Sequence, residues 1–297
     1  MFRGVLQDLW NVYQEKVTYV NPVKQAIAER KDEWNEDHIA FRTFKGTALD
    51  AKALASLFEI FGYEKQDVYF FAEKKLDAFW LKPPVSANEP QKNCLPKIFI
   101  SELRLEDFPS EVNEVIRKYT DTQKVLPFDS IRKSFAAGKY SEVRSGVFQV
   151  LNSIPWQRPS YQDYQFLTQH SEYAAWTLLF GSIPNHFTVS VHLMNSFENL
   201  TEFSEHVETQ LNIPLNKSGG VIKGNPEVLL EQFSTMASKI PYLFQEGLYE
   251  VPYAFIEFAF RFKLENQPEK GLWENYYQGF VMNNADKIFE STNSKPA

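Results

Sequence analysis

The chain has 297 residues, 43% of them hydrophobic and 23% charged, which is the balance of a globular protein with a sizeable core. Its formal net charge of −7, without any basic stripe, argues against a nucleic-acid partner, and its single cysteine, Cys94, excludes an intramolecular disulfide. No window approaches the roughly 18 consecutive apolar residues of a membrane span. Asp8 and Glu15 interrupt the apolar run that a signal peptide needs. We therefore expect a cytoplasmic protein that binds no membrane.

The N-terminal region predicts two helices and then a strand. Apolar residues recur at helical spacing over Phe2–Tyr19, and a second helix is expected to open at Pro22. Glu36–Phe44 instead alternates between two faces, as a strand does. His38 and Arg42 share one of these faces.

A helix and three further strands complete a first block at residues 36–104. The helix is expected over Asp50–Phe61, where leucine and phenylalanine gather on one side. Asp67–Phe71 and Leu76–Leu81 predict a hairpin, and Lys97–Leu103 a last strand. The order of this block is β-α-β-β-β.

The rest of the chain predicts a helical region and then a second block of similar order. Residues 105–180 have too much Phe, Leu and Val for disorder, so we interpret them as a helical insertion. The second block, at residues 181–265, is followed by a tail after Gly271 that we expect to be frayed. Its expected elements are a strand at His186–Met194, helices at Asn199–Leu211 and Leu229–Ala237, and strands at Tyr242–Phe244, Leu248–Val251 and Tyr253–Phe262.

The two blocks indicate an internal duplication. Each opens with a polar residue followed by histidine at the start of a strand, and each of these strands precedes a helix. Duplicated βαβββ units typically close two half-sheets into a barrel-like cleft. We therefore predict an α+β fold in which residues 1–297 form one domain, with paired βαβββ units around a sheet cleft and an additional helical layer.

Three residues of these strands are candidate metal ligands: His38, His186 and Glu257. Two imidazoles and one carboxylate on one side of an ion form the facial triad that suits Fe(II). The alternative interpretation is structural, with histidines packed in strands and Glu257 paired with Arg261 or Arg42. His192 lies about 20 Å along the strand from His186, too far to share an ion with it.

Two basic residues are candidates for binding an anionic substrate. Arg42 lies on the His38 face about 13 Å further along the strand, and its fork-shaped guanidinium suits a carboxylate. Lys223, beside the Gly219–Gly220 turn, could contact an anion through its charge. The structural alternative for Arg42 is an ion pair with Glu102 or Glu257.

Several ordered motifs resemble the 2-oxoadipate dioxygenase/decarboxylase family, a distant branch of the vicinal oxygen chelate superfamily. The motifs are DHIAFRTF (37–44), FISEL (99–103), NHFT (185–188), GGVIKGNPE (219–227), LEQFST (230–235) and FIEFAFR (255–261).

The resemblance implies an iron enzyme of lysine catabolism. His38, His186 and Glu257 match the family's metal ligands, and Arg42 matches its arginine for the substrate carboxylate. The implied reaction converts 2-oxoadipate and O₂ to 2-hydroxyglutarate and CO₂. Fe(II) is the expected cofactor, and a purified sample could instead hold Zn, Ni or Mn. Better-characterised members extend further beyond Glu257, so we expect the substrate pocket to be the part that departs from them.

Two other functions remain open from the residues themselves. A glyoxalase-like lyase or isomerase, or a hydrolase, would use the same cleft if a fourth protein ligand closed the metal site, and Glu102 is the candidate. A non-enzymatic small-molecule binding module would instead hold His38 and His186 too far apart to share an ion.

Overall fold

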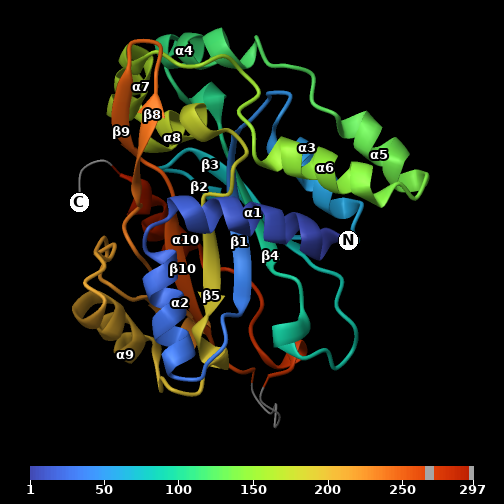
Figure 1. The fold of residues 1–297 in the computed structure, drawn as a ribbon. Helices are drawn as coiled ribbons and strands as arrows, with labels where there is room; N and C mark the ends of the chain where they lie inside the picture. The colour runs from blue at the N-terminus through green and yellow to red at the C-terminus, as the bar shows by residue number, and fades with distance from the viewer. Residues whose placement is uncertain (265–270, 294–297) are drawn as a thin grey trace.

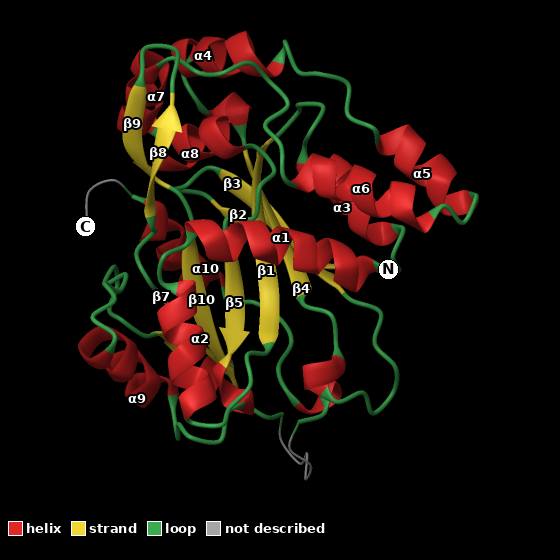
Figure 2. Cartoon of the chain, viewed as in Figure 1, coloured by secondary structure: helices red, strands yellow, loops and turns green. Residues whose placement is uncertain are grey.

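One mixed sheet dominates the computed structural model, which describes residues 1–264 and 271–293 (Figures 1 and 2). Its strands are β1 (Glu36–Phe44), β2 (Glu64–Phe71), β3 (Leu76–Lys82), β4 (Lys97–Leu103), β5 (His186–Ser190), β6 (Lys223–Asn225), β7 (Leu230–Ser234) and β10 (Phe255–Arg261). They lie in the order β2-β3-β4-β1-β5-β10-β7-β6.

The strand order confirms the predicted pair of βαβββ units. In each unit the first and last strands are parallel neighbours, β1 with β4 and β5 with β10. The two units join where β1 runs antiparallel to β5. Strands β4, β1, β5 and β10 therefore lie at the centre of the sheet, and the two halves meet along the β1–β5 seam.

Helices pack against both faces of the sheet, of which the outer one is apolar. The helices are α1 (Phe2–Lys16), α2 (Val20–Glu29), α3 (Ala51–Glu59), α4 (Ser110–Thr120), α5 (Phe128–Ala136), α6 (Tyr140–Leu151), α7 (Tyr161–His170), α8 (Glu172–Phe180), α9 (Leu200–Glu205) and α10 (Met282–Ile288). Helix α1 crosses the sheet in front of β1 and β5 (Figure 1), where the rings of Trp10 and Tyr13 contact Phe187. Helix α3 packs its Phe58 ring against Phe41 of β1. No helix of the described ranges has the length and apolar character that a bilayer crossing requires.

Helix α10 lies on the opposite, inner face and bridges the two edges of the sheet. It contacts β2 at one edge and both β6 and β7 at the other. One short helix reaches both edges because the sheet is curled. The ring of Phe280, just before α10, packs against Trp80 and Phe99 on that inner face. The predicted α+β fold with a barrel-like sheet is therefore confirmed.

Several predicted elements of the second block are wrong. Leu229–Ala237 is not helical, because Leu229 has a positive φ of 59° and the following residues form β7. The expected strands around Tyr242 and Leu248 do form, as β8 (Lys239–Leu243) and β9 (Leu248–Pro252), but they pair only with each other and lie outside the main sheet. The opening strand ends at Ser190 and continues as a short 3₁₀ turn.

The tail after Gly271 is ordered in its described part, contrary to the prediction. Helix α10 is followed by a 3₁₀ turn at Phe289–Thr292, called the C-terminal turn below. Ile288, Ser291 and Thr292 are buried. The tail forms the floor of the curled sheet rather than a loose end.

Candidate metal centre

The three predicted metal ligands lie on neighbouring strands of the inner face. His38 is on β1, His186 on β5 and Glu257 on β10, and all three are buried. Each offers one ligand atom, and these atoms all lie within 4.8 Å of one another. The strand pairing brings together residues that are far apart in the sequence.

Hydrogen bonds set the tautomers of the two histidines. Nδ1 of His38 donates to Oδ1 of Asp37 (2.9 Å), and Nδ1 of His186 donates to Oδ1 of Asn185 (3.0 Å). A carboxylate or carbonyl oxygen only accepts, so the proton of each neutral ring lies on Nδ1. The lone pair of each ring is therefore on Nε2.

Both lone pairs face the carboxylate of Glu257. The distance from Nε2 of His38 to Oε1 is 3.5 Å, and that from Nε2 of His186 to Oε2 is 3.1 Å. Despite this short distance, Nε2 of His186 is buried without a hydrogen bond. Buried polar atoms normally have a partner, and electron-rich atoms that converge on one point accommodate a cation. The donor set fits a divalent metal ion.

The protonation states suit the same purpose. Burial raises the pKa of Glu257, but its interactions with the imidazoles of His38 and His186 and the hydrogen bond from Gln232 outweigh this effect and hold the pKa below the ordinary value. Burial lowers the pKa of His186, which favours the neutral imidazole. A deprotonated carboxylate and a neutral imidazole are the forms that bind a metal.

Further residues orient Glu257. Nε2 of Gln232, on β7, donates to Oε1 of Glu257 (2.5 Å), and Nδ2 of Asn284, on α10, donates to Oε1 of Gln232 (3.2 Å). Gly224 makes room for this contact, because a Cβ there would collide with Asn284 and the carbonyl of Leu230. The chain of hydrogen bonds connects the candidate ligand to the helix on the floor of the sheet.

A buried ionic cluster orients His38. Arg261 donates from Nε to Oδ2 of Asp37 (2.6 Å) and from Nη2 to Oδ1 (2.8 Å), while Nζ of Lys97 lies 3.5 Å from Oδ2. The side chains of all three are fully buried. Burial raises the pKa of Asp37, but Arg261 and Lys97 outweigh it and hold that pKa well below its usual range. The pairing of β1 with β5 changes register between Glu36 and Ile39. Asp37 and His38, which are hydrogen-bonded to each other, lie within this irregular part of the strand.

Arg42 lies on the same face without pairing to Glu102 or Glu257. Its Nη1 donates to Oγ1 of Thr292 (2.9 Å) and its Nη2 to the carbonyl of Phe289 (3.2 Å). Burial lowers the pKa of Arg42 to about 10. The ion pair with Glu102 or Glu257 that was the alternative for this arginine does not form, and its hydrogen-bond partners belong to the C-terminal turn.

The other candidates lie outside the ligand cluster. Nζ of Lys223 donates to the carbonyls of Asn216 (2.6 Å) and Val221 (3.1 Å), and burial lowers its pKa to about 8. Glu102 accepts a hydrogen bond from the backbone of Ala51 at the start of α3, on the outer face of the sheet. His192 packs against the ring of Tyr276.

Sequence reasoning missed the residues that support the ligands. Gln232 lay in a stretch predicted as helix, and Asn284 and Thr292 lay in a tail expected to be frayed. Asp37 was noted only as a polar residue before His38. An acid or amide directly before a strand histidine is the signal that could have identified Asp37 and Asn185 as orienting groups.

Comparison with known proteins gives consistent results. Residues 4–275 match the family model described as 2-oxoadipate dioxygenase/decarboxylase. The Arabidopsis thaliana protein named "2-oxoadipate dioxygenase/decarboxylase, chloroplastic" is 35% identical over 305 residues, which cover 98% of this chain and 77% of that protein. A corresponding protein of Oryza sativa subsp. japonica is 35% identical over 307 residues, covering 99% of this chain and 79% of its own length.

A solved structure extends the comparison to three dimensions. The crystal structure of the hydroxyglutarate synthase from Oryza sativa in complex with 2-oxoadipate has a TM-score of 0.84 and 32% sequence identity, and the match covers 99% of this chain and 93% of that one. Both the sequence and the fold of this chain are thus similar to enzymes of one kind. This chain belongs to the 2-oxoadipate dioxygenase/decarboxylase family.

Proposed function

We propose that this protein is an Fe(II)-dependent dioxygenase/decarboxylase that converts 2-oxoadipate and O₂ to 2-hydroxyglutarate and CO₂, a cytoplasmic step of lysine catabolism. The observation that carries the proposal is the convergence of one ligand atom each from His38, His186 and Glu257, all buried and within 4.8 Å of one another. The reaction balances, because one carbon leaves as CO₂ and the two atoms of O₂ remain in the products.

The number of candidate ligands favours an iron site open to substrate over a metal site closed by a fourth protein ligand. The described residues bring three candidate ligands together, and Glu102, the proposed fourth, lies on the other face. Two histidines and one carboxylate are the ligand set of non-haem Fe(II) oxygenases. Bound there, Fe(II) would supply a Lewis acid and redox centre whose free positions accept the 2-oxoacid group of the substrate.

The chain's own residues position the substrate and exclude water. Arg42 would bind the carboxylate at the far end of 2-oxoadipate, and Lys223, which interacts electrostatically with Glu257, would add positive charge. The rings of Phe280 and Phe255 pack directly against His38 and His186 and keep the surroundings apolar. A fixed distal carboxylate would hold the substrate in one orientation relative to His38, His186 and Glu257. The 2-oxoadipate in the rice structure supports this choice of substrate.

The primary test is oxygen uptake. The purified protein, stripped with a chelator and reloaded with Fe(II), should consume O₂ with 2-oxoadipate and release 2-hydroxyglutarate, identified by mass spectrometry. Reloading with Zn, Ni or Mn serves as the comparison. Absence of O₂ uptake across a broad panel of 2-oxoacids would refute the proposal.

Substitution of a ligand tests the metal site. Glu257→Gln removes the charge but keeps the shape, so the variant should lose bound iron and activity together. His170→Ala, which removes an exposed histidine on α7, is the matched control and should retain both. A Glu257→Gln protein with full iron content and turnover would show that this carboxylate is not a ligand.

Substitution of Arg42 tests the substrate site. Arg42→Ala should raise KM for dicarboxylic 2-oxoacids far more than for monocarboxylic ones, because only the former carry a distal carboxylate. Loss of the Arg42 side chain leaves the same cavity whichever substrate is bound, so the monocarboxylic 2-oxoacids serve as the control for that cavity. An equal rise for both would show that Arg42 does not bind this carboxylate.

A further inference from the structure

We propose that the C-terminal turn is part of the substrate site, and that Thr292 and the carbonyl of Phe289 are positioning groups that turn the Nε edge of Arg42 toward the far carboxylate of the substrate. This inference rests on the proposed function. It assigns a role to a segment beyond the end of the family match at residue 275.

The donors of Arg42 are only partly used. A guanidinium has five N–H donors. Thr292 accepts from Nη1 and Phe289 from Nη2, whereas Nε is buried and has no hydrogen-bond partner. A buried donor without a partner costs about 1–3 kcal/mol. An incoming carboxylate would satisfy Nε and, at the same edge, a remaining Nη proton.

Aromatic rings restrict how the guanidinium can lie. Its central carbon is 4.9 Å from the ring centre of Tyr173, 5.1 Å from that of Trp176 and 5.7 Å from that of Phe289. Such rings favour contact with the guanidinium face and leave its edges for hydrogen bonds. The two acceptors of the C-terminal turn then determine which edge remains available.

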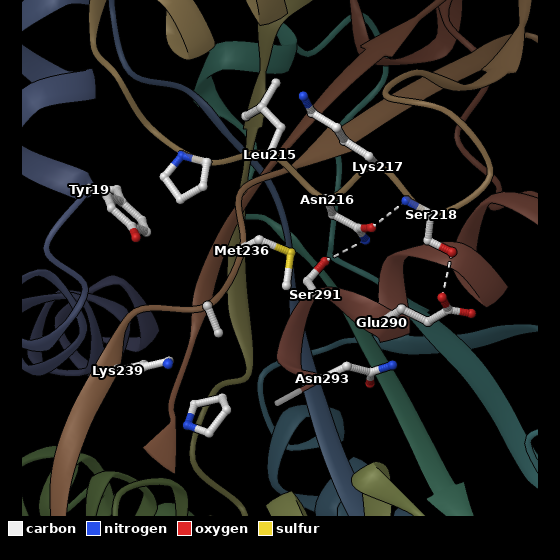
Figure 3. A pocket seen from close by; sticks show the side chains of 13 residues that line it. Tyr19, Leu215, Asn216, Lys217, Ser218, Met236, Lys239, Glu290, Ser291 and Asn293 are labelled. Carbon is white, nitrogen blue, oxygen red and sulfur yellow. Dashed lines mark hydrogen bonds between the residues drawn. The ribbon is translucent and has the colours of Figure 1, made fainter. Parts of the chain in front are cut away.

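The turn is anchored by its other residues. Oγ of Ser291 lies 2.7 Å from Oγ of Ser234 on β7, and Nδ2 of Asn216 donates to Ser291 (2.9 Å). Glu290 accepts hydrogen bonds from Ser218 and from Nζ of Lys74 (3.0 Å). Figure 3 shows Ser291 pointing toward Asn216 and Glu290 toward Ser218. These contacts hold the turn against both edges of the curled sheet.

A cavity lies beside the turn. The cavity has a volume of about 580 Å³ and is lined by Asn216, Met236, Glu290 and Ser291 among others (Figure 3). Thr292, the next residue, contacts Arg42 instead. The turn therefore has the cavity on one side and the proposed carboxylate-binding arginine on the other.

Thr292→Val tests the positioning role. Valine keeps the size and branching of threonine but cannot accept the hydrogen bond from Arg42, so the guanidinium loses one of its two fixed points. A hydrogen bond to a charged group corresponds to about a tenfold or larger effect on affinity. We expect KM for 2-oxoadipate to rise about tenfold, with kcat and iron content unchanged.

Two comparisons isolate the effect. 2-Oxohexanoate has the same chain length without the distal carboxylate, and its KM should not change in Thr292→Val. Thr292→Ser keeps the hydroxyl and should restore the wild-type KM for 2-oxoadipate. Thr201→Val, on the exposed side of α9, is the matched control for the substitution itself.

A binding measurement makes the test independent of turnover. Trp176 packs on Arg42, so titration of the iron-free protein with each 2-oxoacid, followed by tryptophan fluorescence, should report the same selective loss for 2-oxoadipate. Equal changes for both substrates, or none, would overturn the positioning role of Thr292 even if Arg42→Ala behaves as proposed. If the wild-type protein turned over no 2-oxoacid, the proposed function itself would fail.

Discussion

The amine of Lys97 provides a sharp test of the buried cluster next to His38. Burial, reinforced by the charge of Arg261, lowers its pKa from 10.5 to about 7, even though Asp37 acts in the opposite direction. At about 1.36 kcal/mol for each pKa unit, this difference corresponds to about 5 kcal/mol of destabilisation when the amine is protonated in the folded state. Lys97→Met removes the charge and keeps an unbranched side chain.

The sign of the pH dependence follows from proton binding. Because the folded pKa of Lys97 is lower than the unfolded pKa, the unfolded chain binds the extra proton between about pH 7 and 10.5. The destabilisation is complete below pH 7 and disappears as the pH rises through 10.5. Lys97→Met should therefore be more stable than the wild type at pH 7, with an advantage that shrinks toward pH 10.

Urea unfolding at a series of pH values measures this difference. The free energy of unfolding of each protein is obtained by linear extrapolation at pH 6, 7, 8, 9 and 10, in a buffer free of divalent metals. Subtraction of the two curves cancels the titration of the groups that do not interact with Lys97. A difference that does not change with pH, or that grows toward pH 10, would refute the reasoning.

Three further substitutions test the packing around the site. Gln232→Ala should weaken metal binding by about 10–100-fold in a metal titration, because Glu257 loses a supporting hydrogen bond; unchanged affinity would contradict this. Arg261→Met should reduce the free energy of unfolding by about 3–5 kcal/mol, since it leaves a buried carboxylate undercompensated. A loss below 1 kcal/mol would argue against an ionised Asp37. Phe258→Ala removes a buried ring whose centre lies 4.6 Å from that of Phe233. It should lower the free energy of unfolding by about 3–5 kcal/mol without changing the KM for 2-oxoadipate. A marked rise in KM would show that the outer face of β10 affects the site.

The first βαβββ unit could be predicted well because its patterns are long and unambiguous. The bounds of β1 and β4 agree with the predictions at Glu36–Phe44 and Lys97–Leu103. In both strands isoleucine or phenylalanine recurs two residues apart, at Ile39 and Phe41 in β1 and at Ile98 and Ile100 in β4, as in a strand with one buried face. In contrast, β7 has five residues and enters from a left-handed Leu229, so local spacing could not separate strand from helix.

The candidate ligands could be predicted because polar groups in apolar strands are conspicuous. His186 and Glu257 both lie in runs of buried apolar residues, where an imidazole or a carboxylate needs a compensating partner. Their partners could not be predicted. Gln232 reaches Glu257 only through the β7–β10 register, and Thr292 reaches Arg42 only through the curl of the whole sheet. Such contacts depend on tertiary pairing, which no local pattern encodes.

The seam between β1 and β5 also constrains when the site can form during synthesis. His38 contacts Thr188, 150 residues later in the chain, and Arg42 contacts Thr292, 250 residues later. Domains generally fold as units once their chain is available, and contacts over such sequence separations form slowly. A nascent chain on the ribosome therefore has isolated histidines but no complete ligand set until β10 has emerged. The order of the strands therefore delays assembly of the candidate metal site until most of the chain has been made.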